Sequence, residues 1–499
     1  MYLNIQTMDI SFNSLTTVAL IFCATLLCFV KYRRRRGLPP GPTGLPFLGS
    51  IVSTGIQPLR HVEKLRQQYG DVFTLMFGNR NVIIVNGNEA MRELIIKHAD
   101  AVSDRPSVSQ LQLVSNGLGI VGSSGSLWKE QRSFALKTLR SFGFGKRSLE
   151  NQILEEIDIF MEEFRKMDGK PFNPREMLSV AISNIICSIV FGRRFEHDDE
   201  RLHIVLSLVN ENFTSNNSFR FISNIFPWVR YLPGDFTGMK SRLQNISKIK
   251  NFLREQIQCH KDSFDENNIR DYIDAFLSEQ IREKDKTDST FTDEQLLQSL
   301  RDLFVAGSET TATTLRWAIL FLVTNQNIQK KMRDEIDNVI GQNVTPSMEH
   351  KAKLPYCEAV INEVQRLGNI APFAVPHGVR YDVMWKDYVI PKDATLLLNL
   401  ESIGMDPKTF PNPEKFDPDR FLDQNGSCIG QSRFIPFSLG RRVCLGESLA
   451  RMEIFLFVIS LVQNFELRKE DDQSQPSCQP VRGATRSPQP FKIRTIPRN

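Results

Sequence analysis

The chain has 499 residues, of which 41% are hydrophobic and 24% are charged, so it can bury a large globular core. Its formal net charge of +5 is small for this length and gives no indication of a nucleic-acid partner. Eight scattered cysteines form no CxxC pair, which argues against a disulfide framework and a zinc site and fits a reducing compartment.

An apolar segment near the N-terminus predicts a membrane anchor. Residues 10–30 carry no charge, and about 21 helical residues span roughly 31 Å, the thickness of one hydrocarbon core. The cluster KYRRRR follows directly, whereas a cleaved signal peptide carries its cations ahead of the apolar run. We therefore predict a retained signal anchor over residues 1–36 with the bulk of the protein in the cytosol. The alternative is a buried helix of a soluble protein.

N-x-S/T sequons bear on this orientation, because a luminal domain would carry glycans on them. The arginine cluster predicts that all of them face the cytosol and stay unmodified: Asn212, Asn216, Asn245, Asn343 and Asn425.

The segment GLPPGPTGLPFLGS, residues 37–50, is rich in proline. Proline cannot extend a helix, so this segment is predicted to be a stiff, extended hinge between anchor and body. Residues 51–499 contain no long Gly/Ser linker, repeat or low-complexity tract. One large domain is therefore expected over that range.

The body is predicted to be mainly α with minor β. Residues 71–87 indicate two short strands around a turn, and short strands are expected again near the C-terminus. Apolar residues three or four apart predict amphipathic helices at 127–140, 152–167, 177–192 and 244–257. A longer helix begins near Thr292, with Gln295 at capping-box spacing, and runs for about thirty apolar-rich residues. A helix that long and apolar must cross the interior.

The middle of this long helix reads AGSETT, residues 306–311. Glycine in a helix interior costs about 1 kcal/mol, and threonine hydroxyls can bond back to carbonyls one turn earlier. A weakened, buried helix with Glu309 beside Thr310 indicates a polar notch where something binds. The alternative is a cluster of Thr and Glu side chains satisfied within the core.

Three further motifs are weak when taken singly. WKEQR places Trp128 and Arg132 on one helical face, which by itself suits an exposed aromatic–cation pair. EVQR places Glu363 and Arg366 three residues apart, as in an ordinary salt bridge within a helix. FDPDRF then supplies Arg420.

The stretch FSLGRRVCLGE, residues 437–447, places one cysteine between glycines, after two arginines. An apolar helix is expected to follow, so Cys444 would lie at a helix N-terminus. The dipole and free N–H groups there favour a thiolate. The alternative is a buried structural cysteine.

Together, these motifs resemble the cytochrome P-450 family of haem-thiolate monooxygenases. The resemblance covers essentially the whole chain: apolar anchor, PPGP hinge, WxxxR, AGx[DE]TT, ExxR, PxRF and the highly specific FxxGxRxCxG, in that order. FPWVRYLPG, DYIDAFL and FSLGRRVCLGE are most similar to the microsomal vertebrate-type branch that oxidises drugs and fatty acids. The resemblance implies a single large helical domain with the long helix lying over a haem b.

By this resemblance Cys444 is the axial ligand of the haem iron, where an anionic sulfur favours O–O cleavage. Phe437 would shield the sulfur, Gly440 would let the loop turn, and Gly446 would leave room for the porphyrin. The two haem propionates need cations or donors. The matching positions are Trp128, Arg132, His377 and Arg442, with Arg105 in SDRP as a further candidate.

The resemblance also assigns roles away from the cysteine. Thr310 would hold a water in the distal pocket, and Glu309 would help relay protons to it. Ala306 would stay small to leave room for substrate. The matching structural triad is Glu363, Arg366 and Arg420, with Asp419 where the family often has glutamate.

The substrate is expected to be lipophilic, because the candidate pocket segments are apolar. These segments are 107–121, 213–228 and 371–375, the last including Ala371 and Val375. Segment 213–228 suits either contact with the bilayer or packing in the core. Arg220 suits either a fatty-acid carboxylate or solvent.

The implied activity inserts one oxygen atom of dioxygen into a xenobiotic, fatty acid or steroid at the endoplasmic reticulum membrane. Electrons would come from NADPH through a flavoprotein reductase, with a cytochrome b-type protein as a second donor. Basic residues suited to an acidic partner, or to a solvated face, are Lys129, Arg132, Arg140, Lys146, Arg147 and Arg441.

Two alternatives stay open at this point. One is a haem-thiolate isomerase or dehydratase that rearranges peroxides without a reductase; the retained Glu309 and Thr310 argue against it. The other is a non-catalytic haem-binding protein, which would not consume NADPH in response to lipophilic compounds.

Overall fold

The computed structural model describes residues 16–23, 37–45, 48–50, 61–78, 80–107, 109–144, 147–214, 229, 234–235 and 237–498. The predicted anchor lies mostly outside this part of the chain. Residues 16–23 are helical. Within the described ranges, no helix has both the length and the apolar character that a membrane crossing requires.

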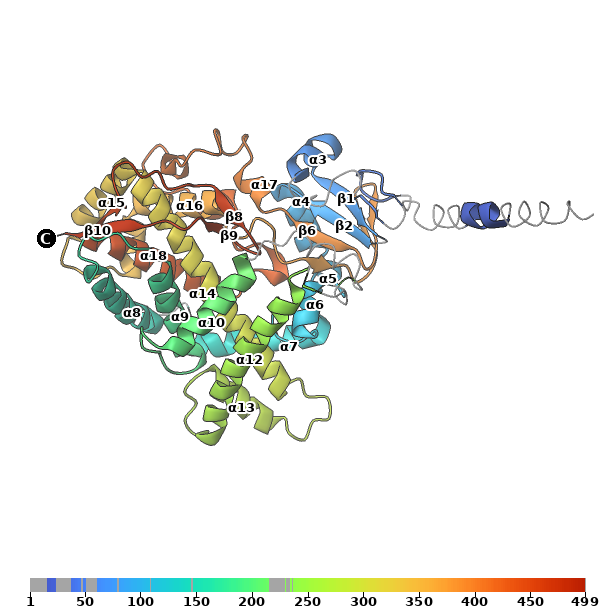
Figure 1. Ribbon diagram of the computed structural model, residues 1–499, viewed down its shortest axis with the longest axis horizontal. Helices are drawn as coiled ribbons and strands as arrows, with labels where there is room; N and C mark the ends of the chain where they lie inside the picture. Colours follow the sequence, from blue (N-terminus) through green and yellow to red (C-terminus); the bar gives the residue numbers. More distant parts are fainter. Residues whose placement is uncertain are drawn as a thin grey trace, which may run out of the picture.

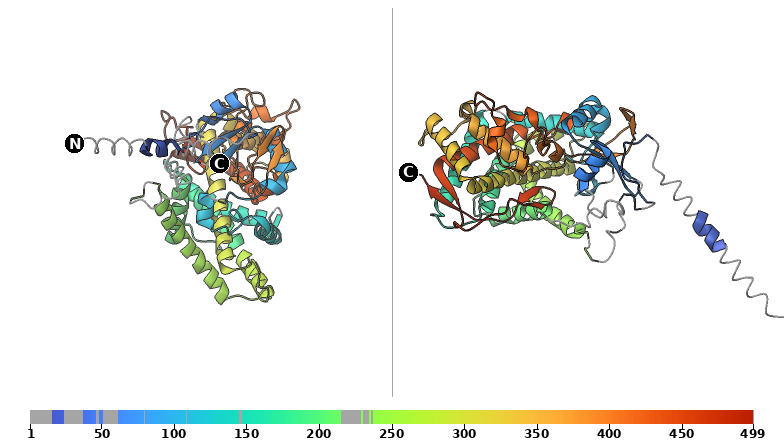
Figure 2. Two further views of the ribbon diagram at one scale, coloured as in Figure 1. Left: turned by 90° about the vertical axis from the view of Figure 1, so that its right-hand side faces the viewer. Right: turned by 90° about the horizontal axis from the view of Figure 1, so that it is seen from above.

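Helices dominate the fold, and the longest of them, α14, runs through the body as a rod (Figures 1 and 2). The helices are α3 (Val62–Tyr69), α4 (Asn88–Arg92), α5 (Ala99–Val102), α6 (Gln110–Ser115), α7 (Gly125–Ser141), α8 (Arg147–Arg165), α9 (Arg175–Val190), α10 (Glu200–Thr214), α12 (Met239–Asp262), α13 (Tyr272–Arg282), α14 (Asp293–Thr324), α15 (Gln326–Val339), α16 (Pro355–Gly368), α17 (Glu401–Gly404) and α18 (Glu447–Asn464). Shorter segments are the π-helix η2 (Glu93–Lys97) and the 3-10 helices η4 (Met348–Lys353), η5 (Pro418–Phe421), η6 (Gly430–Arg433) and η7 (Gly440–Arg442).

A small mixed sheet lies beside the helical mass, at the right of Figure 1. Its strand order is β1-β2-β6-β3, with β2 and β6 parallel and the other pairs antiparallel. These strands are β1 (Val72–Phe77), β2 (Arg80–Val85), β6 (Thr395–Leu398) and β3 (His377–Gly378). Antiparallel pairs also form between β4 (Val383–Trp385) and β5 (Tyr388–Ile390), β7 (Phe465–Lys469) and β10 (Ile493–Pro497), and β8 (Pro480–Arg482) and β9 (Arg486–Pro488).

The predicted elements are therefore confirmed: mainly α, with strands near residues 71–87 and at the C-terminus. The Thr292 side chain caps α14 by accepting from the Gln295 backbone N–H at 3.2 Å. In a full capping box the Gln295 side chain would also accept from the Thr292 backbone N–H, but it makes other contacts here. The Gln295 amide instead accepts from the Gly119 N–H at 3.0 Å and donates to Ser299 at 3.1 Å.

The large core surrounds α14, which packs against α9, α12, α16 and α18. The close packing of α14 against α9 accounts for the glycine at position 307. A Cβ at this position would lie 2.5 Å from the Ile186 side chain on α9, which is closer than such contacts occur. The helix accepts glycine there because α9 crosses α14 at its backbone.

The proline-rich segment is held against the sheet. The Thr74 N–H donates to the Pro40 carbonyl at 2.7 Å, and its hydroxyl donates to the Pro39 carbonyl at 2.9 Å. The Val389 N–H donates to the Gly37 carbonyl at 2.7 Å. The described part of residues 37–50 is thus bonded to β1 and β5, and its role as a hinge stays a prediction.

Candidate active site

The cysteine loop is closed on itself just before α18. The Cys444 N–H donates to the Phe437 carbonyl at 3.0 Å, and the Val443 N–H donates to the Gly440 carbonyl at 3.1 Å. Gly440 has a φ of +75°, and a Cβ on it would meet Ile95 at 2.6 Å. A Cβ on Gly446 would meet nothing within 4 Å. The loop therefore needs glycine at 440 for its turn, while position 446 borders open space.

Cys444 lies at the expected place, two residues before the Gly446 N-cap of α18. Burial nevertheless raises the pKa of its thiol, although the Gly446 N–H and the Arg132 guanidinium act in the opposite direction. Desolvation thus opposes the helix terminus, which favours a thiolate, and the thiolate at this position stays a prediction. A bound metal cation reverses this balance, since a coordinating thiol is deprotonated outright. The donor set therefore suits a metal.

The predicted notch lies in α14. Ala306 is exposed although most of the surrounding helix is buried. The Thr310 hydroxyl donates back to the Ala306 carbonyl at 2.7 Å, and the Thr314 hydroxyl donates to the Thr310 carbonyl at 2.9 Å. These are the back-bonds expected from the sequence.

Glu309 has different partners from Thr310. Its carboxylate accepts from the Thr313 hydroxyl at 2.9 Å, whereas Thr310 is bonded to Ala306. Burial raises the pKa of Glu309, while Thr313 and the Arg316 guanidinium act to lower it. The structure thus places the two predicted proton-transfer groups on one helix turn without joining them directly.

Trp128 lies between two arginines beside the cysteine loop. The guanidinium carbon of Arg442 is 3.9 Å from the Trp128 ring centroid, and that of Arg132 is 6.0 Å away. Arg132 also donates to the Val443 carbonyl at 2.7 Å. Trp128 is only 4% exposed, yet its indole N–H has no partner in the described chain. An unpaired buried donor indicates an acceptor that the protein itself does not supply.

Arg105 and His377 complete this group. The Arg105 guanidinium donates to the carbonyls of Val121, Val375 and Pro376, each at 2.9 Å. Nδ1 of His377 contacts the Val102 carbonyl at 2.8 Å, and because a carbonyl only accepts, this nitrogen carries the proton. Burial, assisted by repulsion from Arg105 and Arg442, lowers the pKa of His377 to about 3.

The guanidinium groups repel one another. Burial and mutual repulsion lower the pKa of Arg105 to about 10 and that of Arg442 to about 8, and burial lowers that of Arg132. Asp302 and Asp104 compensate these charges only in part. Clustered buried cations without matching anions are costly. A ligand with two carboxylates would satisfy them, which fits a haem and its propionates.

The structural triad is brought together as predicted. Glu363 and Arg366 are fully buried, and two hydrogen bonds of 2.6 and 2.8 Å join them. Arg420 reaches the same carboxylate at 3.2 Å. Asp419 points elsewhere, to Lys331 at 3.9 Å, so its replacement of the more common glutamate leaves the triad intact.

Asp302 is a site-supporting residue that the sequence analysis missed. Its carboxylate accepts from the backbone N–H groups of Ile120 and Val121 at 2.9 and 2.8 Å. It thereby ties the pocket segment 107–121 to α14, one turn before Ala306. The available signal was one aspartate inside the long, apolar-rich helix that the sequence predicts.

The pocket residues stay a prediction, and the structure describes only some of them. Val375 is 43% exposed and Ala371 is half-buried. Because Arg105 binds the Val375 carbonyl, it positions this segment beside the cationic group. Residues 215–228, including Arg220 and Asn216, lie outside the described residues, as do Lys146 and the side chain of Arg147.

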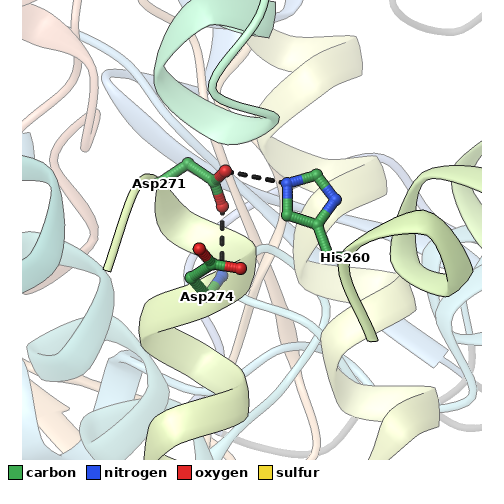
Figure 3. Close-up of side chains that lie close together, drawn as sticks. All are labelled: His260, Asp271 and Asp274. Atoms are coloured by element: carbon green, nitrogen blue, oxygen red, sulfur yellow. Dashed lines mark hydrogen bonds and ion pairs between the residues drawn. The ribbon is translucent and has the colours of Figure 1, made fainter. Parts of the chain in front are cut away.

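A second polar cluster, away from this site, joins α12 to α13 (Figure 3). His260 Nε2 lies 2.8 Å from the Asp271 carboxylate, and Asp271 caps α13 by accepting from the Asp274 N–H at 3.0 Å. Arg270 binds Asp274 through bonds of 2.5 and 2.9 Å. His260, Asp271 and Asp274 together have the composition of a metal site. Since Arg270 and N–H groups already satisfy the carboxylates, we interpret the cluster as a charge network.

This network predicts a pH-dependent stability. The pKa of His260 is raised, with Asp271 and the Gln256 carbonyl outweighing burial. Protonated His260 therefore contributes its full stabilisation of the folded protein below the ordinary histidine pKa near 6.5. This contribution is lost as the pH rises through the higher pKa that His260 has in the folded protein. We expect His260→Gln to cost about 1.5–3 kcal/mol at pH 6, as for a charged hydrogen bond, and less at alkaline pH. Thermal unfolding midpoints across this range measure the difference.

His203→Gln is the matched control for this prediction. His203 contacts Glu176 at 2.8 Å in a similar pair, but the Glu176 side chain is mostly exposed. Loss of the His203–Glu176 pair should therefore lower the free energy of unfolding by less than loss of the His260–Asp271 pair. A constant difference between wild type and His260→Gln from pH 6 to pH 9 would contradict the assignment.

A cysteine loop beside buried, only partly compensated guanidinium groups suits a haem whose iron takes a thiolate, and with the helical fold it defines a haem-thiolate protein. A family model described as Cytochrome P450 matches residues 39–495, so the chain belongs to the cytochrome P450 family.

Similar relatives include cytochrome P450 2C28 of Mesocricetus auratus, 41% identical over 93% of this chain and 95% of the relative. Cytochrome P450 2C23 of Rattus norvegicus is 40% identical over 98% of this chain and 99% of its own length. Cytochrome P450 2C8 of Homo sapiens is 40% identical over 96% of this chain and 99% of its own length.

Membership of this family confirms the reaction class predicted from the sequence. The protein is a haem-dependent monooxygenase that binds haem b through a cysteine thiolate and acts on lipophilic xenobiotics, fatty acids or steroids. It requires a redox partner, and its relatives support association with the endoplasmic reticulum membrane. The isomerase and carrier alternatives are not supported.

Proposed function

We propose that Cys444 is the cysteine whose thiolate ligates the haem iron. The observation that carries this assignment is the unpaired Trp128 N–H within the guanidinium cluster beside the Cys444 loop. Among the described cysteines, Cys187 and Cys357 are sealed in the core, where burial raises the pKa of each thiol. Neither shares its surroundings with a cationic cluster.

The same cluster would hold the haem carboxylates. Trp128, Arg132, Arg442 and Arg105 supply N–H groups and positive charge. His377 already donates from Nδ1 to a carbonyl, so Nε2 can donate to a carboxylate only in the imidazolium form, which a bound carboxylate favours. Phe437 is held at the loop by Arg451, whose guanidinium lies 4.6 Å from the ring centroid, and would screen the sulfur.

The bound haem supplies the activation of dioxygen, and the chain supplies position and protons. Thr310 would release its bond to the Ala306 carbonyl to hold a water in the pocket. Glu309, with a raised pKa, would exchange a proton after turning from Thr313. Ala306 leaves space for a substrate carbon. Exposed Val375 and Leu113 provide apolar contacts suited to a lipophilic substrate.

We further propose that the redox partner is an NADPH-dependent flavoprotein reductase, with a cytochrome b-type protein as a second donor. Lys129 and Arg140 are exposed on α7, where they can attract an acidic partner. Arg441 is paired with Asp100, and Arg132 is turned inward to Val443. The available positive charge is therefore smaller than the sequence indicated.

The proposed topology is a single N-terminal anchor with the catalytic domain in the cytosol, as the cations after residues 10–30 indicate. Asn212 and Asn245 are buried in α10 and α12, so the folded protein cannot present them for modification. Asn343 and Asn425 are exposed and should remain unmodified in the cytosol. The domain division 1–36, 37–50 and 51–499 stays a prediction.

Replacing Thr310 with alanine tests the proton-delivery role. We expect Thr310→Ala to retain the haem spectrum but to lower product formed per NADPH by several-fold (about 10-fold or less), with the lost electrons recovered as peroxide. The loss stays below the factor of about 10² that a positioned acid–base group contributes, because water can still deliver protons without the Thr310 hydroxyl. Reconstituted turnover with reductase, measuring NADPH, product and peroxide together, provides the readout.

Thr324→Ala is its matched control. Thr324 makes the same kind of back-bond, to the Leu320 carbonyl at 2.8 Å, at the far end of the same helix. It should leave coupling unchanged. If Thr310→Ala forms as much product per NADPH as Thr324→Ala, Thr310 has no part in proton delivery.

A further inference from the structure

Arg301 is a buried cation on α14 that none of the roles above uses. It is 8% exposed and lies four residues before Val305, hence on the same face of the helix. Val305 is half-buried and adjoins the exposed Ala306. The rise of an α-helix separates the Arg301 backbone from that of Ala306 by about 7.5 Å along the axis. Arg301 is therefore a neighbour of the proposed pocket, one and a half turns from the residue that leaves room for substrate.

The guanidinium of Arg301 lies where α14 meets the pocket segment 107–121. It donates to the Val114 carbonyl on α6 and to the Asp302 carboxylate, each at 3.3 Å. Both bonds are long, and a guanidinium carries five N–H donors. Within the part of the chain that the structure describes, its other donors find no acceptor. Arg301 thus keeps hydrogen bonds for a ligand.

A second cation comes from α12, which packs against α14 (Figure 1). Lys250 is half-buried and makes no hydrogen bond or ion pair with the residues that the structure describes. Burial lowers the pKa of its ammonium, and repulsion from Arg301 acts in the same direction, while Glu294 and Asp302 oppose both. The two cations are therefore close enough to repel each other.

The nearby acids do not balance this positive charge. Glu294 is exposed in the first turn of α14. Asp302 already accepts from two backbone N–H groups of the pocket segment and from the Gln298 amide at 3.1 Å. Its carboxylate also acts on Arg105, where it opposes the loss of charge. Buried cations are rarely left without an anion, and the carboxylate of a bound molecule would provide one.

We propose that Arg301 and Lys250 form a carboxylate-binding subsite at one end of the substrate pocket, so that the preferred substrates are lipophilic acids. The carboxylate takes the spare donors of Arg301 and the ammonium of Lys250. The apolar tail extends along Val305 toward Ala306, with exposed Leu113 of α6 beside it. Carbons next to the carboxylate are thereby held away from Ala306, and oxygen enters farther along the tail. This inference deepens the proposed function and rests on the pocket beside Ala306.

Calorimetric titration of the haem-loaded protein with laurate and with methyl laurate tests the subsite without turnover. Wild type should bind laurate at least about 10-fold more tightly than the ester, because only the acid accepts charged hydrogen bonds. Arg301→Gln should weaken laurate binding about 10- to 100-fold and leave binding of the ester within about twofold. Lys250→Gln, which removes no bond within the described chain, should weaken laurate binding in the same direction. Equal affinities of wild type for acid and ester would overturn the proposal.

Arg254→Gln and Lys248→Gln are the matched controls. Both residues are exposed on α12, where Arg254 bonds Asn251 at 3.0 Å. Each variant removes one positive charge from the surface, so laurate should bind to it as to wild type. Arg301→Lys should restore part of the laurate affinity, since lysine keeps the charge but not the forked geometry. An equal loss in Arg254→Gln and Arg301→Gln would overturn the proposal, because overall charge would then explain the effect.

Reconstituted turnover of laurate tests the orientation of the bound acid. Arg301→Gln should raise KM for laurate about 10- to 100-fold and change kcat little, because the group acts on binding and not on the reacting carbon. Oxygen insertion by wild type at the carbon next to the carboxyl would overturn the proposal. Ala306→Leu tests the pocket separately and should lower oxidation of both laurate and methyl laurate. If it lowers neither, the pocket beside Ala306 fails while the calorimetric assignment of Arg301 still stands.

Discussion

Replacing Cys444 with alanine is expected to abolish the thiolate-type spectrum of the reduced, carbon-monoxide-bound protein. The Cys444 backbone N–H donates to the Phe437 carbonyl, and the Gly446 N–H and the Arg132 guanidinium act to stabilise an anionic sulfur. Alanine removes the sulfur with little change in volume. The strongly red-shifted Soret band of wild type should disappear completely, and monooxygenase turnover should disappear with it.

Cys478→Ala is the control for this prediction, because Cys478 is exposed on the segment before β8 and lies far along the chain from the cysteine loop. It should keep the red-shifted band. Persistence of that band in Cys444→Ala would assign the ligand to another cysteine. A wild-type spectrum typical of histidine ligation would indicate that Cys444 does not bind the iron in the folded protein.

Local features of the site could be predicted from the sequence because they depend on helix geometry alone. Glu363 and Arg366 are three residues apart on one helix, and they pair as that spacing requires. Thr310 and Thr314 make the back-bonds typical of threonine in a helix. The hairpin β1–β2 follows from two short strand-like runs around the turn residues FGNRN.

Long-range features could not be obtained from spacing. Arg442 lies 3.9 Å from the Trp128 ring although more than three hundred residues separate them, and only the family resemblance suggested that they meet. The net effect on the Cys444 pKa depends on how much protein surrounds the thiol, which no motif encodes. Glu309 bonds Thr313 instead of Thr310 because side chains four apart face each other whereas neighbours do not.

Burial also explains why Asp302 was missed. It carries no recognisable motif, since its carboxylate serves backbone N–H groups of a distant loop. In the sequence it is one acid within a long helix. Its significance appears only when the partner loop and the lack of exposure are known.

The triad leads to the second large effect. Arg366→Ala is expected to cost about 3–5 kcal/mol of unfolding free energy, because it leaves the fully buried Glu363 carboxylate without its bidentate partner. Arg420, at 3.2 Å, replaces only part of that interaction. A typical domain has about 5–15 kcal/mol to lose, so the yield of haem-loaded protein should also fall sharply. Urea unfolding midpoints measure the change.

Arg165→Ala provides the matched control, since Arg165 and Glu162 form the same i,i+3 pair on the exposed face of α8. Water screens that pair, so its loss should cost less than about 1 kcal/mol. Arg366→Lys should recover only part of the loss, because lysine keeps the charge but not the forked geometry. Equal costs for Arg366→Ala and Arg165→Ala would mean that Glu363 is stabilised by Arg420 and the Asp417 N–H, which lies 2.9 Å away, without help from Arg366.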